Sequence, residues 1–248
     1  MSDPERNRLE TAGRSVREAL GLELDNSAAP GMRTMLDELM FGGIWARPGL
    51  DLADRLVATI AGLAALERSA PLCTYATVAL KRAALSADGV REIVIQAGLY
   101  TGFVAAEANL TAVNTVLPPV PDAEHWGPDE AADLSAIGAS LMDEIHGPRA
   151  RAGYASGSGA PTELYDLAIR YGYGLLWNRP GLERRQRFIT TVAVFTALEQ
   201  PTQLVKFSSS ARDNGLSREQ VIEVVMQTAP YCGFPRALNA LSHLDAAG

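Results

Sequence analysis

The stretch FGGIWARPGLDLADRLVATIAGLAALE at residues 41–67 decides the fold, because the chain repeats it as YGLLWNRPGLERRQRFITTVAVFTALE at residues 173–199. These stretches align without a gap at an offset of 132, whereas YTGF at 100–103 matches YCGF at 231–234 at an offset of 131. We therefore place one extra residue in the first copy, near Ser69. Two units of about 110 residues are too long and too few for a solenoid, so we expect two related, fused domains.

The hydrophobic spacing in both copies is typical of helices. Apolar side chains in residues 51–66 recur at intervals of three and four, and residues 182–198 repeat that pattern. Asp51 suits the N-cap of the first of these helices, and Ser86 and Ser217 suit the N-cap of a further helix in each copy. We expect the remaining helices at residues 5–20, 71–85, 104–115, 129–146, 201–213 and 235–244. No pair of strands joined by a hairpin turn is evident, which predicts an all-α bundle.

The expected domains are copy one at residues 1–117 and copy two at residues 129–248, related by pseudo-two-fold symmetry. A linker at residues 118–128 separates them, because four of its residues are proline. A second loop at residues 153–161, GYASGSGAP, is flexible by its composition.

Composition excludes several classes of protein. Of the 248 residues, 47% are apolar and 21% are charged, which is typical of a globular protein. The formal net charge of −7 argues against a nucleic-acid partner, which would require a basic surface. No segment approaches the roughly 20 apolar residues of a membrane helix. Residues 1–14 also lack the apolar segment of a secretory signal, so we expect a cytoplasmic protein without a membrane partner.

Cofactor signatures are also missing from the sequence. Two cysteines cannot form a disulfide framework, and three scattered histidines do not suggest a metal site. The glycines between 153 and 159 follow no expected strand and lack the lysine of a phosphate-binding loop. We therefore expect no metal and no other cofactor.

Copy two carries the repeated motifs most completely, as WNRPGL at 177–182, NGLS at 214–217 and YCGFPRALNAL at 231–241. This order of motifs resembles the carboxymuconolactone decarboxylase family, and the resemblance extends over about 33–117 and 163–244. It implies the all-helical fold of the alkylhydroperoxidase-D-like group. It also implies a homo-oligomer, either a trimer that looks like a pseudo-hexamer or a dimer, and a small-molecule substrate.

The same resemblance shows what this chain lacks. The family's characteristic histidine lies at a fixed distance before the tyrosine of the Y-x-G-F motif, and counting back by that distance gives Ala76 in copy one and Phe207 in copy two. Peroxide-reducing relatives also use two cysteines and a relay glutamate. Their positions are occupied here by Leu72, Ser69 and Leu56 in copy one and by Gln203, Gln200 and Phe188 in copy two. Peroxidase activity needs two thiols that form and resolve a disulfide, so we do not expect it.

Four residues are the candidates for catalysis. Cys73 and Tyr75 lie beside the lost histidine, where a thiolate would be a nucleophile and a hydroxyl would donate to a ligand oxygen; both also suit a buried packing role. Glu107 stands where copy two has Leu238, so we expect it to face the core, where burial raises the pKa of a carboxylate toward neutrality. Arg55 suits a bidentate clamp on a substrate carboxylate, and equally a structural ion pair.

The candidates for substrate binding share a place near the lost histidine positions or on the repeated motifs. They are Trp45, Ala76, Tyr100, His146, Arg187, Phe207 and Tyr231. His146 ends the helix expected at 129–146, where the helix dipole favours it, and it is also able to replace the lost histidine from another direction.

Two functions follow from these features. The first is a cofactor-independent enzyme that resembles carboxymuconolactone decarboxylase and acts on a small cyclic acid, lactone or polyketide-like carbonyl compound. Such a carbon–carbon lyase, isomerase or cyclase works mainly by stabilising an enolate and by positioning the substrate. The alternative is a binding or assembly protein that kept the fold and lost the site. A third arrangement makes copy one catalytic and copy two structural.

Overall fold

The structure is a computed structural model that describes residues 3–23, 29–120, 131–151 and 162–247. Within these ranges the chain forms helices and turns without a strand, which confirms the predicted all-α class. No helix in the described ranges is long and apolar enough to cross a membrane. Most of the predicted linker 118–128, and the loop predicted at 153–161, lie outside the described residues.

Each copy contains N-terminal helical segments followed by a four-helix unit. In copy one the elements are α1 (Pro4–Leu20), α2 (Met32–Met35), the π-helix η1 (Leu36–Trp45), α3 (Leu52–Ala65), α4 (Ser69–Lys81), α5 (Ala87–Thr101) and α6 (Phe103–Val113). In copy two they are α7 (Ala131–His146), the 3₁₀-helix η2 (Gly147–Arg151), α8 (Thr162–Leu167), the π-helix η4 (Ala168–Tyr173), the 3₁₀-helix η5 (Leu176–Asn178), α9 (Arg184–Ala197), α10 (Pro201–Asp213), α11 (Arg218–Cys232) and α12 (Phe234–Ala246).

The predicted caps fix where three of these helices begin. Asp51 accepts a hydrogen bond from the backbone N–H of Asp54 at 2.8 Å and so starts α3. Ser86 and Ser217 do the same for α5 and α11. Each cap satisfies a backbone donor that the first helical turn leaves without a partner.

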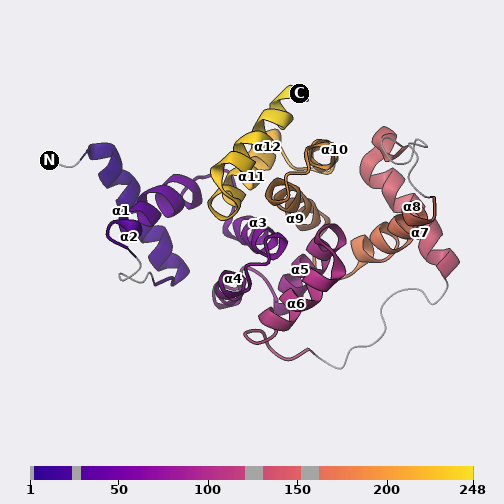
Figure 1. Cartoon of the computed structure of the whole chain (residues 1–248), viewed down its shortest axis with the longest axis horizontal. Coiled ribbons are helices and arrows are strands. Elements are labelled where there is room, and N and C mark those ends of the chain that lie inside the picture. Colours follow the sequence, from indigo (N-terminus) through magenta and orange to yellow (C-terminus); the bar gives the residue numbers. More distant parts are fainter. Residues whose placement is uncertain (1–2, 24–28, 121–130, 152–161, 248) are drawn as a thin grey trace.

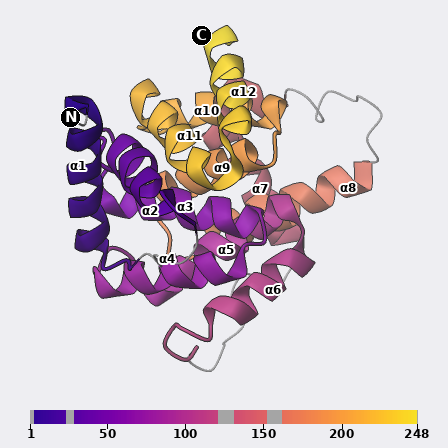
Figure 2. The same cartoon turned by 60° about the vertical axis from the view of Figure 1, so that its left-hand side comes forward.

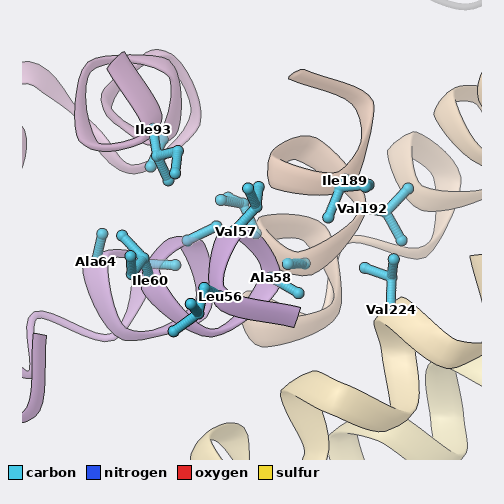
Figure 3. Close-up of a cluster of buried hydrophobic side chains, with 14 of the residues drawn as sticks. Leu56, Val57, Ala58, Ile60, Ala64, Ile93, Ile189, Val192 and Val224 are labelled. Atoms are coloured by element: carbon cyan, nitrogen blue, oxygen red, sulfur yellow. The ribbon is translucent and has the colours of Figure 1, made fainter. Parts of the chain in front are cut away.

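The two copies share one hydrophobic core. Figure 1 shows α3, α5, α9 and α11 at the centre of the molecule, with α1 and α7 on opposite sides. Helix α3 of copy one lies beside α9 of copy two, and Val57, Ile60, Ile189, Val192 and Val224 are completely buried between the central helices (Figure 3). Burying each such side chain stabilises the fold by about 1.5–3 kcal/mol. The two copies therefore form one packing unit.

The extra residue of copy one lies elsewhere than predicted. The buried positions of α4 match those of α10 at an offset of 132, from Leu72 with Leu204 to Ala79 with Ala211, so the chain has not gained a residue near Ser69. The offset changes in the turn between α4 and α5, where Ala83 has a φ of 50°. Tyr75 is therefore the counterpart of Phe207. Counting back the same number of residues from Tyr100 and from Tyr231 therefore gave Ala76 and Phe207, which are not equivalent positions.

Glycines allow the N-terminal helix of each copy to cross the following π-helix closely. A Cβ atom on Gly42 would lie 2.1 Å from the carbonyl oxygen of Leu9, and one on Gly174 would lie 2.1 Å from the carbonyl oxygen of Leu134. Backbone therefore touches backbone at equivalent places in α1 with η1 and in α7 with η4. Figure 2 shows the first of these crossings, with α1 forming one side of the molecule.

The close crossing predicts a contrast between neighbouring glycines. Gly42→Ala is expected to lower the free energy of unfolding by about 1–3 kcal/mol, because the new methyl group overpacks the crossing. Gly43→Ala is the matched control, since its Cβ would lie at an ordinary 3.5 Å from the Glu38 carbonyl oxygen. Urea unfolding of both variants at one protein concentration measures the difference. Equal losses would show that the crossing does not govern stability.

Candidate functional site

An ion-pair network anchored by Arg55 joins copy one to copy two. Nη1 of Arg55 donates to Oε1 of Gln227 at 2.8 Å, and Nη2 lies 3.3 Å from a carboxylate oxygen of Glu223. Arg47 donates to the same carboxylate at 2.7 Å. Arg55 and Glu223 are both buried, so each charge has lost its contact with water and is stabilised by the other.

Arg187 anchors the symmetric network on the other side. Its Nη1 donates to Oε1 of Gln96 at 2.8 Å, its Nη2 lies 3.3 Å from Glu92, and Arg179 donates to Glu92 at 2.9 Å. Burial lowers the pKa of Arg187 from its ordinary value, and Glu92 opposes that effect. The structure thus places Arg55 and Arg187 in matching structural networks, with the glutamine of each network leading toward an aromatic cluster.

The copy-one cluster consists of Trp45, Tyr75 and Tyr231. The rings of Trp45 and Tyr75 are stacked with centroids 5.7 Å apart, and Tyr231 meets Tyr75 edge-on at 5.6 Å. Nε1 of Trp45 donates to the Tyr231 hydroxyl at 3.0 Å. Burial raises the pKa of Tyr75 to about 12, so this hydroxyl stays protonated near neutral pH.

The copy-two cluster repeats this arrangement around Phe207. Nε1 of Trp177 donates to the Tyr100 hydroxyl at 3.1 Å, and the Tyr100 ring meets Phe195 at 4.7 Å and Phe207 at 6.1 Å. Burial raises the pKa of Tyr100 to about 12. Each cluster therefore combines a tryptophan from one copy with a tyrosine from the other, and each holds a protonated phenol.

His146 distinguishes the copy-two cluster. Its ring meets Phe207 edge-on at 4.7 Å, and the side chain is completely buried. Nδ1 lies 2.7 Å from Oγ of Ser210, and Nε2 lies 2.8 Å from the Tyr173 hydroxyl. An imidazole from α7 thus contacts Phe207, the α10 residue that the sequence resemblance places where the family has its histidine.

Tyr173, His146 and Ser210 form a chain of hydrogen bonds whose donors and acceptors can be arranged in either direction. Burial lowers the pKa of His146 to about 3, so the ring is neutral near pH 7 and carries one N–H. One hydroxyl therefore donates to the ring and the other accepts from it. Ser210 also donates to the Lys206 carbonyl at 3.1 Å, which favours the order Tyr173 to His146 to Ser210. Tyr173 is the partly exposed end of this chain, and Ser210 is completely buried.

Copy one does not contain this chain. Gly13 and Gly138 occupy equivalent positions at the helix crossings, which aligns α1 with α7 at an offset of 125. The counterparts of His146, Tyr173 and Ser210 are then Gly21, Phe41 and Val78. Three polar groups have thus been placed together in one copy at positions that the other fills with small or apolar residues.

The sequence-based expectation that Glu107 faces the core is wrong. Glu107 is exposed on α6, and its counterpart Leu238 is 59% exposed on α12, so both side chains point away from the core. Cys73 lies between α4 and α6, where its Sγ is 3.3 Å from the Ala112 carbonyl. Ala76 is completely buried within α4. None of these three residues is among the members of either aromatic cluster.

Sequence reasoning missed Tyr173, Ser210 and the paired glutamines. Gln96 and Gln227 share an offset of 131 in the sequence, and this repetition was the signal that could have found them. The sequence held no comparable signal for Ser210, because its role depends on a histidine 64 residues away. In the described part of the chain, no three His, Cys, Asp or Glu side chains are grouped as metal ligands.

The buried ring predicts how stability depends on pH. An unfolded histidine titrates near pH 6.5, so between about pH 6.5 and 3 the unfolded chain binds one proton more than the folded chain. The contribution of the neutral ring is complete above about pH 6.5 and is lost as the pH falls. Between about pH 6 and 4, the free energy of unfolding should fall about 1.4 kcal/mol per pH unit more steeply in the wild type than in His146→Gln.

Urea titrations across that pH range measure both slopes. Ser210→Ala keeps the buried ring and should keep the steep slope, which separates titration of the histidine from loss of a hydrogen bond. Identical slopes in the wild type and His146→Gln would contradict a neutral, buried His146.

Comparison with known proteins finds the same family in both copies of the repeat. The sequence profile of the carboxymuconolactone decarboxylase family matches residues 30–115 and 162–246, one match in each copy. The chain is 33% identical over 82 residues to 4-carboxymuconolactone decarboxylase of Acinetobacter baylyi, and 30% identical over 76 residues to nitrosuccinic acid decarboxylase npaB of Metarhizium robertsii. These alignments cover 33% and 31% of this chain, and they span only 60% and 53% of the two relatives.

Proposed function

The chain belongs to the carboxymuconolactone decarboxylase family, and from this premise we propose that it is a cofactor-independent carbon–carbon lyase. Both relatives are named as decarboxylases, which supports a decarboxylation. The proposed substrate is a small cyclic acid, lactone or polyketide-like carbonyl compound.

The observation that carries the proposal is the position of His146 against Phe207. An acid–base group of the type the family uses is present at 4.7 Å from the ring that replaces the family histidine. Its two ring nitrogens are hydrogen-bonded to the hydroxyl groups of buried Ser210 and of partly exposed Tyr173. A buried polar chain of this kind is costly to maintain unless every member is satisfied, which supports a functional reason for it.

The proposed reaction has two steps. The bond between the carboxylate and the substrate carbon breaks, carbon dioxide leaves, and the electron pair is accepted by the neighbouring carbonyl as an enolate. The protonated phenol of Tyr100 donates a hydrogen bond to that enolate oxygen, and such a donor lowers the barrier by about 3–4 kcal/mol. The substrate carbon then takes the proton of the Tyr173 hydroxyl, and water restores that proton at Tyr173, the partly exposed end of the chain.

The low pKa of His146 determines its role in this sequence. A ring that titrates near pH 3 does not store a proton at neutral pH. When Ser210 donates to Nδ1, the N–H at Nε2 donates to Tyr173, which leaves the Tyr173 proton for the substrate and stabilises the phenolate that remains. We propose Arg187 as a positioning residue that acts through Gln96, whose Nε2 lies 3.4 Å from the Tyr100 hydroxyl. Arg55 has the matching position in copy one, and we propose that its role is structural.

We also propose that the chain forms a homo-oligomer. Phe103 of α6 and Phe234 of α12 are exposed at equivalent positions, and Val104 and Leu238 are also exposed on these two helices. Contact between two protein chains would remove this apolar surface from water. Sedimentation equilibrium should give a mass above that of a single chain, and a strictly monomeric mass would contradict this.

The proposed function is tested by binding and turnover together. Lactones, aromatic acids, β-keto acids and polycyclic quinones are screened by thermal shift, since a ligand at about 100 Kd stabilises the fold by about 2.7 kcal/mol. Every ligand found is then assayed for carbon dioxide release. Release above the uncatalysed rate supports a lyase. Binding of acids without conversion would contradict a lyase and support the binding or assembly alternative.

A further inference from the structure

A groove behind the copy-two cluster is not used by the proposed mechanism. It has a volume of about 200 Å³ and lies where α9 ends, α10 begins and α12 crosses them. Phe195 and Leu204 line its buried, apolar part. The ring of Phe195 also lies 4.7 Å from that of Tyr100 and 5.3 Å from that of Phe207, so the groove and the cluster share this residue.

The polar side of the groove is formed by groups able to bind an anion. Arg236, Asn239 and His243 follow one another along one face of α12 at helical spacing. Nη1 of Arg236 donates to the Ala197 carbonyl at 2.6 Å, which fixes the guanidinium over the end of α9. Nε lies 3.3 Å from a carboxylate oxygen of Glu199. These contacts use two of the five N–H donors of a guanidinium, so donors remain for a ligand.

The arginine and the imidazole of the groove occur in copy two alone. The counterparts of Arg236 and His243 in α6 are Ala105 and Ala112, whereas Glu199 has a glutamate counterpart, Glu67. The groove and the His146 chain therefore occur in the same copy, although they are built from different helices. In a chain with a net charge of −7, a fixed arginine beside an apolar floor is a specific feature of this surface.

We propose that the groove binds a small cyclic carboxylate, with its carboxylate on Arg236 and its ring against Phe195 and Leu204. A volume of about 200 Å³ is below the 300–1,000 Å³ of sites for drug-sized ligands, which fits a single-ring acid. The ligand carboxylate accepts from the remaining N–H donors of Arg236 beside Glu199, so the two carboxylates repel each other and compete for the same positive charge. This deepens the proposed function and rests on it for the class of ligand.

The test is a calorimetric titration with cyclohexanecarboxylate and with its neutral amide as the matched probe. The acid is expected to bind the wild type and to bind Arg236→Met at least tenfold more weakly, while the amide binds both equally weakly. Glu199→Gln is expected to bind the acid several-fold more tightly, because it removes the competing carboxylate. That gain of affinity cannot arise from a variant that has merely lost its fold.

Arg218→Met is the control for removing an exposed arginine, because Arg218 pairs with Asp245 outside the groove. Equal affinity of the acid for the wild type and Arg236→Met, or unchanged affinity in Glu199→Gln, would overturn the proposal. Binding is measured without turnover. Failure here therefore leaves the lyase proposal standing, and failure of carbon dioxide release leaves the groove standing.

Discussion

Replacing Arg187 with methionine is expected to lower the free energy of unfolding by about 3–5 kcal/mol. The guanidinium is 2% exposed, and its loss removes a partner from buried Glu92 and from the Gln96 amide. Removing one member of a buried ion pair costs more than the pair itself contributes, because the remaining charge stays desolvated. Urea unfolding at a fixed protein concentration measures the change.

Two further variants define what the loss means. Arg55→Met should cost about the same, because Arg55 makes the symmetric contacts with Gln227 and Glu223. Arg218→Met should cost less than about 1 kcal/mol, since its pair with Asp245 is exposed. If Arg187→Met unfolded within about 1 kcal/mol of the wild type, the network would not hold the two copies together.

Removing the His146 ring is expected to lower kcat by about 10²-fold or more, because the proton donor Tyr173 loses the group that holds its hydroxyl and stabilises its phenolate. His146→Gln keeps polar atoms near Ser210 and Tyr173, so the fold should survive at neutral pH. Tyr173→Phe should also lose most of the turnover, and copy one shows that the fold accepts this residue, because the counterpart of Tyr173 is Phe41. Turnover of the acid found by screening, corrected for the folded fraction, measures both losses.

The pH profile tests the mechanism behind this loss. A ring with a pKa near 3 does not change its charge near neutral pH, so kcat should not follow a histidine titration between about pH 5 and 8. A profile with a midpoint near 6.5 that disappears in His146→Gln would show instead that the ring stores the proton.

Local patterns explain what the sequence predicted well. Helical spacing, the caps at Asp51, Ser86 and Ser217, and the repeat at an offset of 132 all depend on residues close together in the chain or on direct identities between the copies. The extra residue of copy one was misplaced because the segment between 67 and 100 has few identities between the copies. Burial along α4 and α10 resolves the register, and burial is a property of the folded chain.

The sites were harder to predict, for two physical reasons. Glu107 was expected to face the core because its counterpart is Leu238, yet α6 and α12 both present apolar side chains to the outside. An apolar residue on a helix therefore does not by itself mark the buried face. His146 contacts Phe207 although the two lie on helices far apart in the sequence, and nothing local indicates where the end of α7 lies in the fold.

One comparison tests most directly whether copy two carries the reaction. Tyr100→Phe and Tyr231→Phe remove equivalent hydroxyls, each of which accepts a hydrogen bond from a tryptophan at 3.1 and 3.0 Å. Their costs to folding should be alike, so the rate of carbon dioxide release isolates function. The rate should fall at least tenfold in Tyr100→Phe and stay near the wild-type rate in Tyr231→Phe. Equal losses in the two variants, or a loss in Tyr231→Phe alone, would contradict a reaction centre in copy two.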